Sequence, residues 1–242
     1  MHTLTKTTTH EDLPRGRGVL PHGGPRHPNG PCGNARRADR QIRRARVLEN
    51  NHIERVLALI ESSSNSPRSD ELKFLLSVYA GLRVSEIAGI TIDAFLTADG
   101  AIGSSMVINS RIAKGGRGRI IPIHPLIRNA LGRFRKAHPK TEFIAFSNRR
   151  GICRQSTEAV KSWFSRIFSD AGLQGCSSHS GRRTFITRLA RSANQFNRSL
   201  RDVQLLAGHQ RLETTQAYIE PADDLDELVA SLGTNPRGKT AA

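Results

Sequence analysis

Apolar side chains recur with helical spacing along most of this chain, but only from about residue 46 onward. A helix that packs on a core buries one face, so its apolar residues return every three to four positions. The first such stretch carries Val47, Ile53, Val56, Leu57 and Ile60. A series of amphipathic helices is therefore the main constraint on the fold, and residues 1–45 lie outside it.

Further helices are expected wherever this spacing returns. The second follows a serine-rich loop, with Ser69 or Asp70 as its N-terminal cap, and ends near Gly81. Another is capped by Ser156 and stopped at Gly172. The helical ranges expected after residue 100 are 124–137, 156–172, 183–192, 199–208, 214–218 and 223–232.

Two short runs of β character, residues 106–112 and 119–123, flank the sequence KGGRG. Glycines suit a turn between paired strands, so we expect a β-hairpin here. The sequence FIAF at 143–146 is expected to form another short strand. The predicted fold is mostly α with a small antiparallel β-sheet, which is an α+β class.

Residues 1–45 are rich in Gly, Pro and Arg and lack apolar periodicity. Such a segment has too little apolar surface to order itself, so it is expected to be a disordered basic tail. A solvated tail and an arm that contacts DNA both fit this composition. Residues 46–232 are expected to form the folded domain, and 233–242 a disordered C-terminal tail.

The chain carries a formal net charge of +16, and its first 50 residues contribute 10 Lys and Arg against 4 Asp and Glu. Most of the excess therefore lies in the rest of the chain. A basic balance favours a nucleic-acid partner, because Lys and Arg neutralise phosphates. The sequence has no run of 18 apolar residues and no apolar signal-peptide core, so we expect no membrane partner and a cytoplasmic location. The three cysteines lack metal-ligand spacing and are expected to be free thiols.

Polar residues that could carry chemistry lie at the joints between these elements. One is a tyrosine, of which the chain has only two, at the end of the polar stretch GHQRLETTQAY. Others lie in GLRVSE, AKGGRGR and HSGRRTF, where a His and an Arg three residues apart would share a helix face. The six candidates are Arg83, Lys114, His179, Arg182, His209 and Tyr218.

These residues, in this order and spacing, resemble the tyrosine recombinases of the phage-integrase family. The resemblance covers roughly residues 46–232. It implies the catalytic-domain fold of that family and a site-specific DNA recombinase or integrase, which breaks and rejoins strands through a covalent 3′-phosphotyrosyl intermediate. Tyr218 then resembles the nucleophile, which must be exposed to reach a DNA phosphate.

The resemblance also implies roles for the other candidates. Arg83 and Arg182 would neutralise the attacked phosphate, because guanidinium donors fit two phosphate oxygens and keep their charge. His179 would act as the base or orienting partner of Tyr218, whose reference pKa is about 10. Lys114 would protonate the leaving 5′ oxygen, and His209 would donate to the phosphate.

Glu86 matches an acidic position of the family that supports the arginines, and it also reads as an ordinary carboxylate at a helix start. The scheme implies no metal and no cofactor, in keeping with a sequence that has no GxxxxGK[ST] loop and no carboxylate cluster.

The sequence departs from the family pattern at three places. Gly181 stands where the family often has Leu, and we expect looser packing near His179 there. The stretch from Arg182 to His209 is longer than usual, around SANQFNR. Only about 80 residues precede Arg83, although most members carry a helical domain before the catalytic one, so either a short family type or a truncated gene is implied.

The resemblance implies double-stranded DNA as the partner, with a free monomer that forms a homotetramer on two synapsed sites. The segment 223–232 resembles the element that docks on a neighbouring protomer, and it equally fits a helix packed on its own domain. Two alternative functions use the same features: relaxation of DNA as by a type IB topoisomerase, and DNA binding by a non-catalytic remnant of an integrase.

Overall fold

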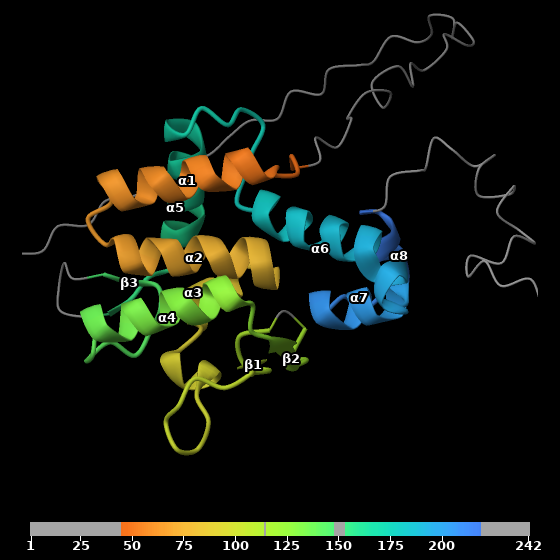
Figure 1. Ribbon diagram of the computed structural model, residues 1–242, viewed down its shortest axis with the longest axis horizontal. Coiled ribbons are helices and arrows are strands. Elements are labelled where there is room, and N and C mark those ends of the chain that lie inside the picture. Colours follow the sequence, from red (N-terminus) through yellow and green to blue (C-terminus); the bar gives the residue numbers. More distant parts are fainter. Residues whose placement is uncertain (1–44, 114, 148–152, 219–242) are drawn as a thin grey trace, which may run out of the picture. The chain divides into compact units, whose positions relative to one another are not determined.

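The computed structural model describes residues 45–113, 115–147 and 153–218, all within the unit Arg43–Ala242. These residues form eight α-helices, two short 3-10 helices and two small antiparallel sheets (Figure 1). The elements are α1 (Asn50–Ser63), α2 (Pro67–Ala80), α3 (Val84–Gly89), η1 (Ile92–Phe95), β1 (Ser105–Ile108), β2 (Arg119–Pro122), α4 (Pro125–Ala137), β3 (Phe146–Ser147), β4 (Cys153–Arg154), α5 (Thr157–Asp170), α6 (Ser180–Ser192), η2 (Ala193–Phe196), α7 (Leu200–Ala207) and α8 (Leu212–Gln216). The predicted α+β class is confirmed.

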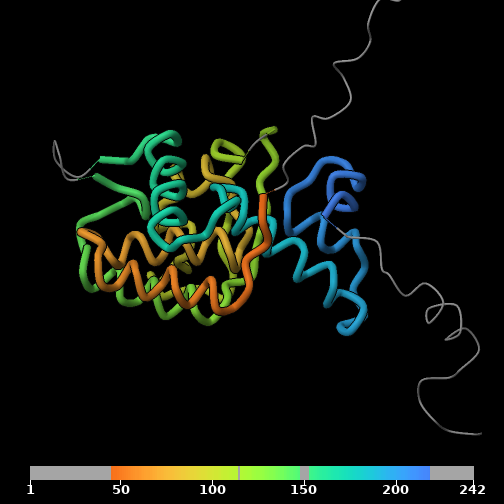
Figure 2. The backbone as a smooth tube through the Cα atoms, turned by 90° about the horizontal axis from the view of Figure 1, so that it is seen from above, coloured from red at the N-terminus to blue at the C-terminus, as the bar shows by residue number. Residues whose placement is uncertain are grey.

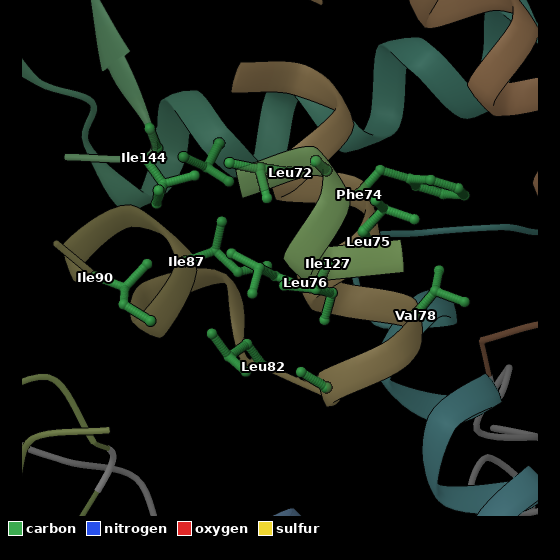
Figure 3. Packing of buried hydrophobic residues seen from close by; sticks show 14 of the residues in the cluster. Leu72, Phe74, Leu75, Leu76, Val78, Leu82, Ile87, Ile90, Ile127 and Ile144 are labelled. Carbon is green, nitrogen blue, oxygen red and sulfur yellow. The ribbon is translucent and has the colours of Figure 1, made fainter. Parts of the chain in front are cut away.

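Helix α2 is the centre of the core. It packs against α1, α4 and α6, and Figure 1 shows α1, α2 and α4 stacked side by side. Because it has neighbours on several sides, α2 is buried around most of its circumference, and even its polar Ser77 is fully buried. Figure 3 shows Leu72 and Leu76 of α2 among side chains of α3 and α4, such as Ile87 and Ile127.

A second, smaller cluster joins α6, α7 and α8, which lie together in Figure 2 (blue). Its buried members are Phe185, Ile186, Ala193, Val203 and Ala207. Tyr218 packs against this cluster at its edge. The C-terminal helices therefore have their own apolar contacts, which hold the tyrosine beside α6.

Gly81 ends α2 and sets the direction of the chain toward Arg83. Its φ is +62°, and a Cβ placed there would lie 2.3 Å from the Phe185 ring. Only glycine combines this left-handed backbone with such close approach of another helix. The break after α2 is thus fixed by both conformation and packing against α6.

Most of the predicted helices are confirmed, but the start of α2 was wrong. The helix begins at Pro67, with Ser66 as its N-cap, because proline is favoured in the first helical turn. Ser69 and Asp70 are instead inside the helix. Ser69 is buried and donates to the Ile144 carbonyl (2.6 Å), and Asp70 pairs with Lys73 (2.6 Å).

Two further element boundaries differ from the prediction. Val47 lies before α1, in an extended segment where the Leu48 N–H donates to the Thr184 hydroxyl (2.8 Å). The FIAF strand is reduced to Phe146 in β3 and an isolated bridge from Phe143 to Thr91. The segment expected to form the last helix, 223–232, lies outside the described residues, as do both predicted tails apart from residue 45.

The predicted hairpin is confirmed as β1 paired antiparallel with β2, with Val107 opposite Ile120. Its strands are shorter than predicted, because β1 ends at Ile108 and the connection runs through residues 109–118. The described cysteines, Cys153 and Cys176, are free thiols as predicted. Within the described ranges, no helix is both long and apolar enough to cross a membrane.

Gly181 does not loosen the packing near His179, contrary to expectation. A Cβ at this position would lie 2.3 Å from the Ser77 hydroxyl oxygen and 3.1 Å from the Ser77 backbone carbon. The missing side chain therefore allows α6 to lie directly on α2. The contact is tighter than a leucine would permit.

Candidate active site

One pocket, of about 650 Å³, collects five of the six candidate residues. Its lining comes from the start of α3, the N-terminal half of α5, the start of α6 and the turn between α7 and α8. The candidates that line it are Arg83, His179, Arg182, His209 and Tyr218. Lys114 lies outside the described residues, but its neighbour Gly115 lines the same pocket.

Arg83 is held in place by one carboxylate and one backbone carbonyl. Its Nη1 donates to Glu86 Oε1 (2.9 Å), and its Nη2 donates to the Gly208 carbonyl (2.9 Å). Its backbone N–H also donates to Glu86 Oε2 (2.8 Å) at the start of α3. The guanidinium is therefore fixed at the pocket wall while it remains partly exposed.

Glu86 is fully buried, so it is not an ordinary exposed carboxylate at a helix start. Arg119 of β2 contacts it with two N–H groups, each at 2.8 Å. Burial alone would raise the pKa of Glu86, but the hydrogen bonds and charges of Arg119 and Arg83 outweigh it and hold that pKa below its usual value. The carboxylate therefore stays charged between two arginines.

Arg182 is buried in the first turn of α6 and reaches across to two other elements. Its guanidinium donates to the Gly81 carbonyl at the end of α2 and to the Ala207 carbonyl at the end of α7 (2.6 Å for the latter). Burial first, and then the charge of Arg83, lower the pKa of Arg182 to about 10. It therefore still carries its charge at neutral pH.

His209 follows the left-handed Gly208 (φ +64°), which ends α7 and turns the chain into the pocket. Its carbonyl accepts from Gln204 Nε2 (3.0 Å), and its Nδ1 lies 3.0 Å from the Thr215 hydroxyl. Burial first, and then the charges of three neighbouring arginines, lower the pKa of His209 from 6.5 to about 4. The imidazole is therefore neutral at pH 7.

Tyr218 lies just after α8, where its N–H donates to the Thr215 carbonyl (3.0 Å). Its ring stacks on His209, with centroids 5.6 Å apart and planes inclined by 25°. The residue is half-buried, and its backbone carbonyl accepts from the Thr187 hydroxyl (3.4 Å). The phenol therefore lines the pocket while the ring rests on the C-terminal cluster.

His179 is the N-cap residue of α6, and it is exposed. Its backbone N–H donates to the Ser177 hydroxyl (3.3 Å), and its Nδ1 is 3.5 Å from the Ser178 hydroxyl. The predicted sharing of one face by His179 and Arg182 is confirmed to the extent that both line the pocket. His179 is the more accessible of the two.

The sequence prediction missed Arg119, which completes the network around Glu86. A signal existed, because strand alternation places residue 119 on the same face as the buried Ile121. Lys161 and Thr157 of α5 also line the pocket and were not predicted. Within residues 45–113, 115–147 and 153–218, no group of three or more His, Cys, Asp or Glu could hold a metal ion.

Known proteins resemble this chain over most of the described region. Tyrosine recombinase XerD of Lacticaseibacillus casei is 26% identical over 202 residues, which cover 79% of this chain and 64% of the relative. The crystal structure of XerA recombinase superposes with a TM-score of 0.59 at 22% identity, over 78% of this chain and 66% of that one. The Tn1549 transposon integrase in complex with transposon right-end DNA gives 0.61 at 17% identity, over 77% and 64%.

The chain thus spans less than two thirds of the length of these relatives, and the structural likenesses establish the fold. The match to a whole family is broader. The sequence profile of the phage integrase family matches residues 46–224, which include all six candidate residues. The resemblance seen in the sequence is confirmed, and the chain belongs to the phage integrase family.

Proposed function

We propose that this protein is a site-specific DNA recombinase that cuts and rejoins strands through a phosphotyrosyl intermediate. The observation that carries the proposal is the convergence of Arg83, Arg182, His209 and Tyr218 on one pocket. These residues lie on segments far apart in the sequence, and the hydrogen bonds between the segments hold them together. A relative named as a tyrosine recombinase and an integrase in complex with transposon-end DNA support the same reading.

Phosphate binding is assigned to the two arginines. A guanidinium has five N–H donors, and backbone carbonyls or Glu86 take two from each side chain. The remaining donors of Arg83 and Arg182 can bind the non-bridging oxygens of a phosphodiester. Because their partners fix both groups before DNA arrives, little reorganisation is needed when negative charge develops on the phosphate.

Strand cleavage is a transfer of the phosphoryl group to Tyr218. The phenol oxygen forms a bond to phosphorus, and the bond between phosphorus and the 5′ oxygen breaks. The phenol proton passes to His179, and Lys114 gives a proton to the departing 5′ oxygen. Attack by another 5′-hydroxyl on the phosphotyrosine reverses these steps and joins the strands without a further energy source.

His209 acts as a neutral hydrogen-bond donor in this scheme. With a pKa of about 4, it carries a single ring proton at pH 7. If the Thr215 hydroxyl donates to Nδ1, that proton is on Nε2, the nitrogen left to bind the phosphate. Its stacking on the Tyr218 ring keeps the donor next to the nucleophile.

The proposed substrate is double-stranded DNA, which places the protein in the cytoplasm with the DNA. Four protomers would act on two synapsed sites, with the free protein a monomer. An apolar surface supports self-association: Phe196 and Leu205 are 72% and 57% exposed, and they border a pocket of about 470 Å³. Exposed apolar patches of this kind mark contact sites between proteins.

The test is a suicide-substrate assay with nicked duplexes that carry candidate sites flanking the gene. The wild-type protein should form a covalent adduct, and Tyr218→Phe should form none while it binds the same DNA. Tyr79→Phe is the matched control, because that ring stacks on His124 and packs on the core (centroids 4.4 Å apart). An adduct of normal yield in Tyr218→Phe would refute the assignment.

The products distinguish the two alternative functions. Recombinant strands from two sites identify a recombinase, whereas relaxation of supercoils without recombinants identifies a topoisomerase-like enzyme. DNA binding with no adduct on any substrate would identify a non-catalytic remnant.

A further inference from the structure

Arg119 lies behind the proposed active site and is not among the residues that line its pocket. Its side chain is 8% exposed, so its charge is almost completely enclosed by protein. It makes three hydrogen bonds: two to the Glu86 carboxylate at 2.8 Å, and one from Nε to the Leu206 carbonyl at 3.1 Å. Arg119 therefore joins β2 to both α3 and α7.

The Glu86 carboxylate is shared by two arginines in a regular pattern. Oε1 accepts from Nη1 of Arg83 (2.9 Å) and from Nη1 of Arg119 (2.8 Å). Oε2 accepts from the Arg83 backbone N–H (2.8 Å) and from Nη2 of Arg119 (2.8 Å). A bidentate contact fixes the plane of a carboxylate as well as its position. The orientation of Arg83 therefore depends on the arginine on the other side of Glu86.

The end of α7 is held by the same set of arginines. Three successive carbonyls, of residues 206, 207 and 208, accept from Arg119, Arg182 and Arg83 respectively. These carbonyls form the negative end of the helix, where positive side chains bind favourably. Gly208 also approaches Arg119 closely, since a Cβ there would lie 3.0 Å from Arg119 Cδ. One arginine thus determines how α7 meets the two arginines that face the pocket.

We propose that Arg119 is a positioning residue for strand cleavage, which acts through Glu86 to aim Arg83 at the phosphate. It contacts neither the phosphate nor Tyr218 and stabilises the arrangement from behind. This inference rests on the proposed function, because it assigns a role within that reaction.

The central test is Arg119→Lys, which keeps the positive charge but loses the planar fork. A lysine has one nitrogen and cannot bind both carboxylate oxygens and the Leu206 carbonyl in the same geometry. We expect single-turnover adduct formation at saturating DNA to fall by up to roughly 10²-fold, because small displacements of a catalytic group have effects of that size. DNA affinity should stay close to wild type, since the charge is retained.

Arg128→Lys is the matched control. Arg128 is also half-buried, and its guanidinium donates to the carbonyls of Ile102 (2.9 Å) and Gly103 (2.6 Å), away from the pocket. It should lose stability in the same way and keep the wild-type cleavage rate. All rates are measured at a temperature where circular dichroism shows every variant folded.

A double-mutant cycle with Glu86→Gln separates positioning from general stability. If Arg119 acts through Glu86, the double variant should cleave about as slowly as the slower single variant, because both changes break the same chain of contacts. Rate losses that multiply would overturn the inference. A substrate with sulfur at the bridging 5′ position needs no proton on its leaving group, so it should not rescue Arg119→Lys. Full rescue would place the effect on Lys114 and overturn the path through Arg83.

The same assay separates failure of this inference from failure of the proposed function. A wild-type protein that forms no adduct on any site contradicts the proposed function itself. A wild-type protein that forms the adduct, together with an Arg119→Lys variant of equal rate, overturns only the role of Arg119.

Discussion

Replacing Gly181 with alanine adds one methyl group at the closest contact between α6 and α2. The new Cβ would lie 2.3 Å from the Ser77 hydroxyl oxygen, 2.8 Å from the Ser77 Cβ and 3.1 Å from its backbone carbon. Rotation of the hydroxyl could relieve only the first of these contacts. The two helices must therefore move apart by a few tenths of an ångström.

The net effect on stability is the difference between two terms. Overpacking of a tight contact costs about 1–3 kcal/mol. Alanine recovers up to about 1 kcal/mol of helix propensity, and less at Gly181, which is only the second residue of α6. We expect a loss of about 1–2 kcal/mol, which lowers Tm by roughly 2–8 °C in a chain of this size.

Cleavage should suffer as well, because the next residue is Arg182, which bridges α6 to the ends of α2 and α7. A shift of a few tenths of an ångström at a phosphate-binding group should slow adduct formation on the order of 10-fold. Thermal unfolding followed by circular dichroism and single-turnover cleavage on a nicked duplex measure the two effects.

Gly132→Ala is the matched control of opposite sign. Gly132 lies in the middle of α4, and a Cβ there meets nothing within 4 Å, so alanine should raise stability by up to about 1 kcal/mol. Ser77→Ala should recover part of the loss in Gly181→Ala, because it removes the closest contact and a buried hydroxyl that has no hydrogen-bond partner among the described residues. A Tm for Gly181→Ala at or above wild type would refute the reasoning.

Three further predictions concern chemistry, pH and the N-terminal segment. A substrate with sulfur at the bridging 5′ position should restore cleavage by Lys114→Ala but not by Arg182→Ala, since only the first lacks an acid; equal rescue of both in a single-turnover assay would show that Lys114 is not that acid. The folded pKa of His209 is about 4, below its ordinary value of 6.5, so the unfolded chain binds a proton first as the pH falls. The free energy of unfolding should therefore drop from pH 6.5 toward pH 4, and urea titrations should find a shallower drop in His209→Gln, with identical curves counting against the depressed pKa. A chain shortened to begin at Arg46 should melt as the full chain does, and loss of DNA-backbone contacts by an arm would flatten the salt dependence of binding by about 0.9 per phosphate; a lower Tm would contradict the disorder predicted for residues 1–45.

The helices could be predicted from sequence because their signals are local. Helical spacing, the Ser156 cap and glycines such as Gly81 and Gly172 depend on residues within one or two turns of each other. The start of α2 failed for a related reason: several serines could serve as caps, and only the burial of Ser69 against Ile144 excludes it. The candidate residues were found through the order of their motifs, which the family match supports.

The ion network around Glu86 depends on contacts that no local signal encodes. Arg119 is 33 residues from Glu86, and Arg83 is 125 residues from the carbonyl of Gly208 that it binds. The basic hairpin offers Arg117 as well as Arg119, and the pairing of β1 with β2 and the contact with α7 determine which one turns inward. The sequence shows that positive side chains are available, whereas the folded chain selects those that are buried, because only a buried arginine requires the matching carboxylate and carbonyls that fix its direction.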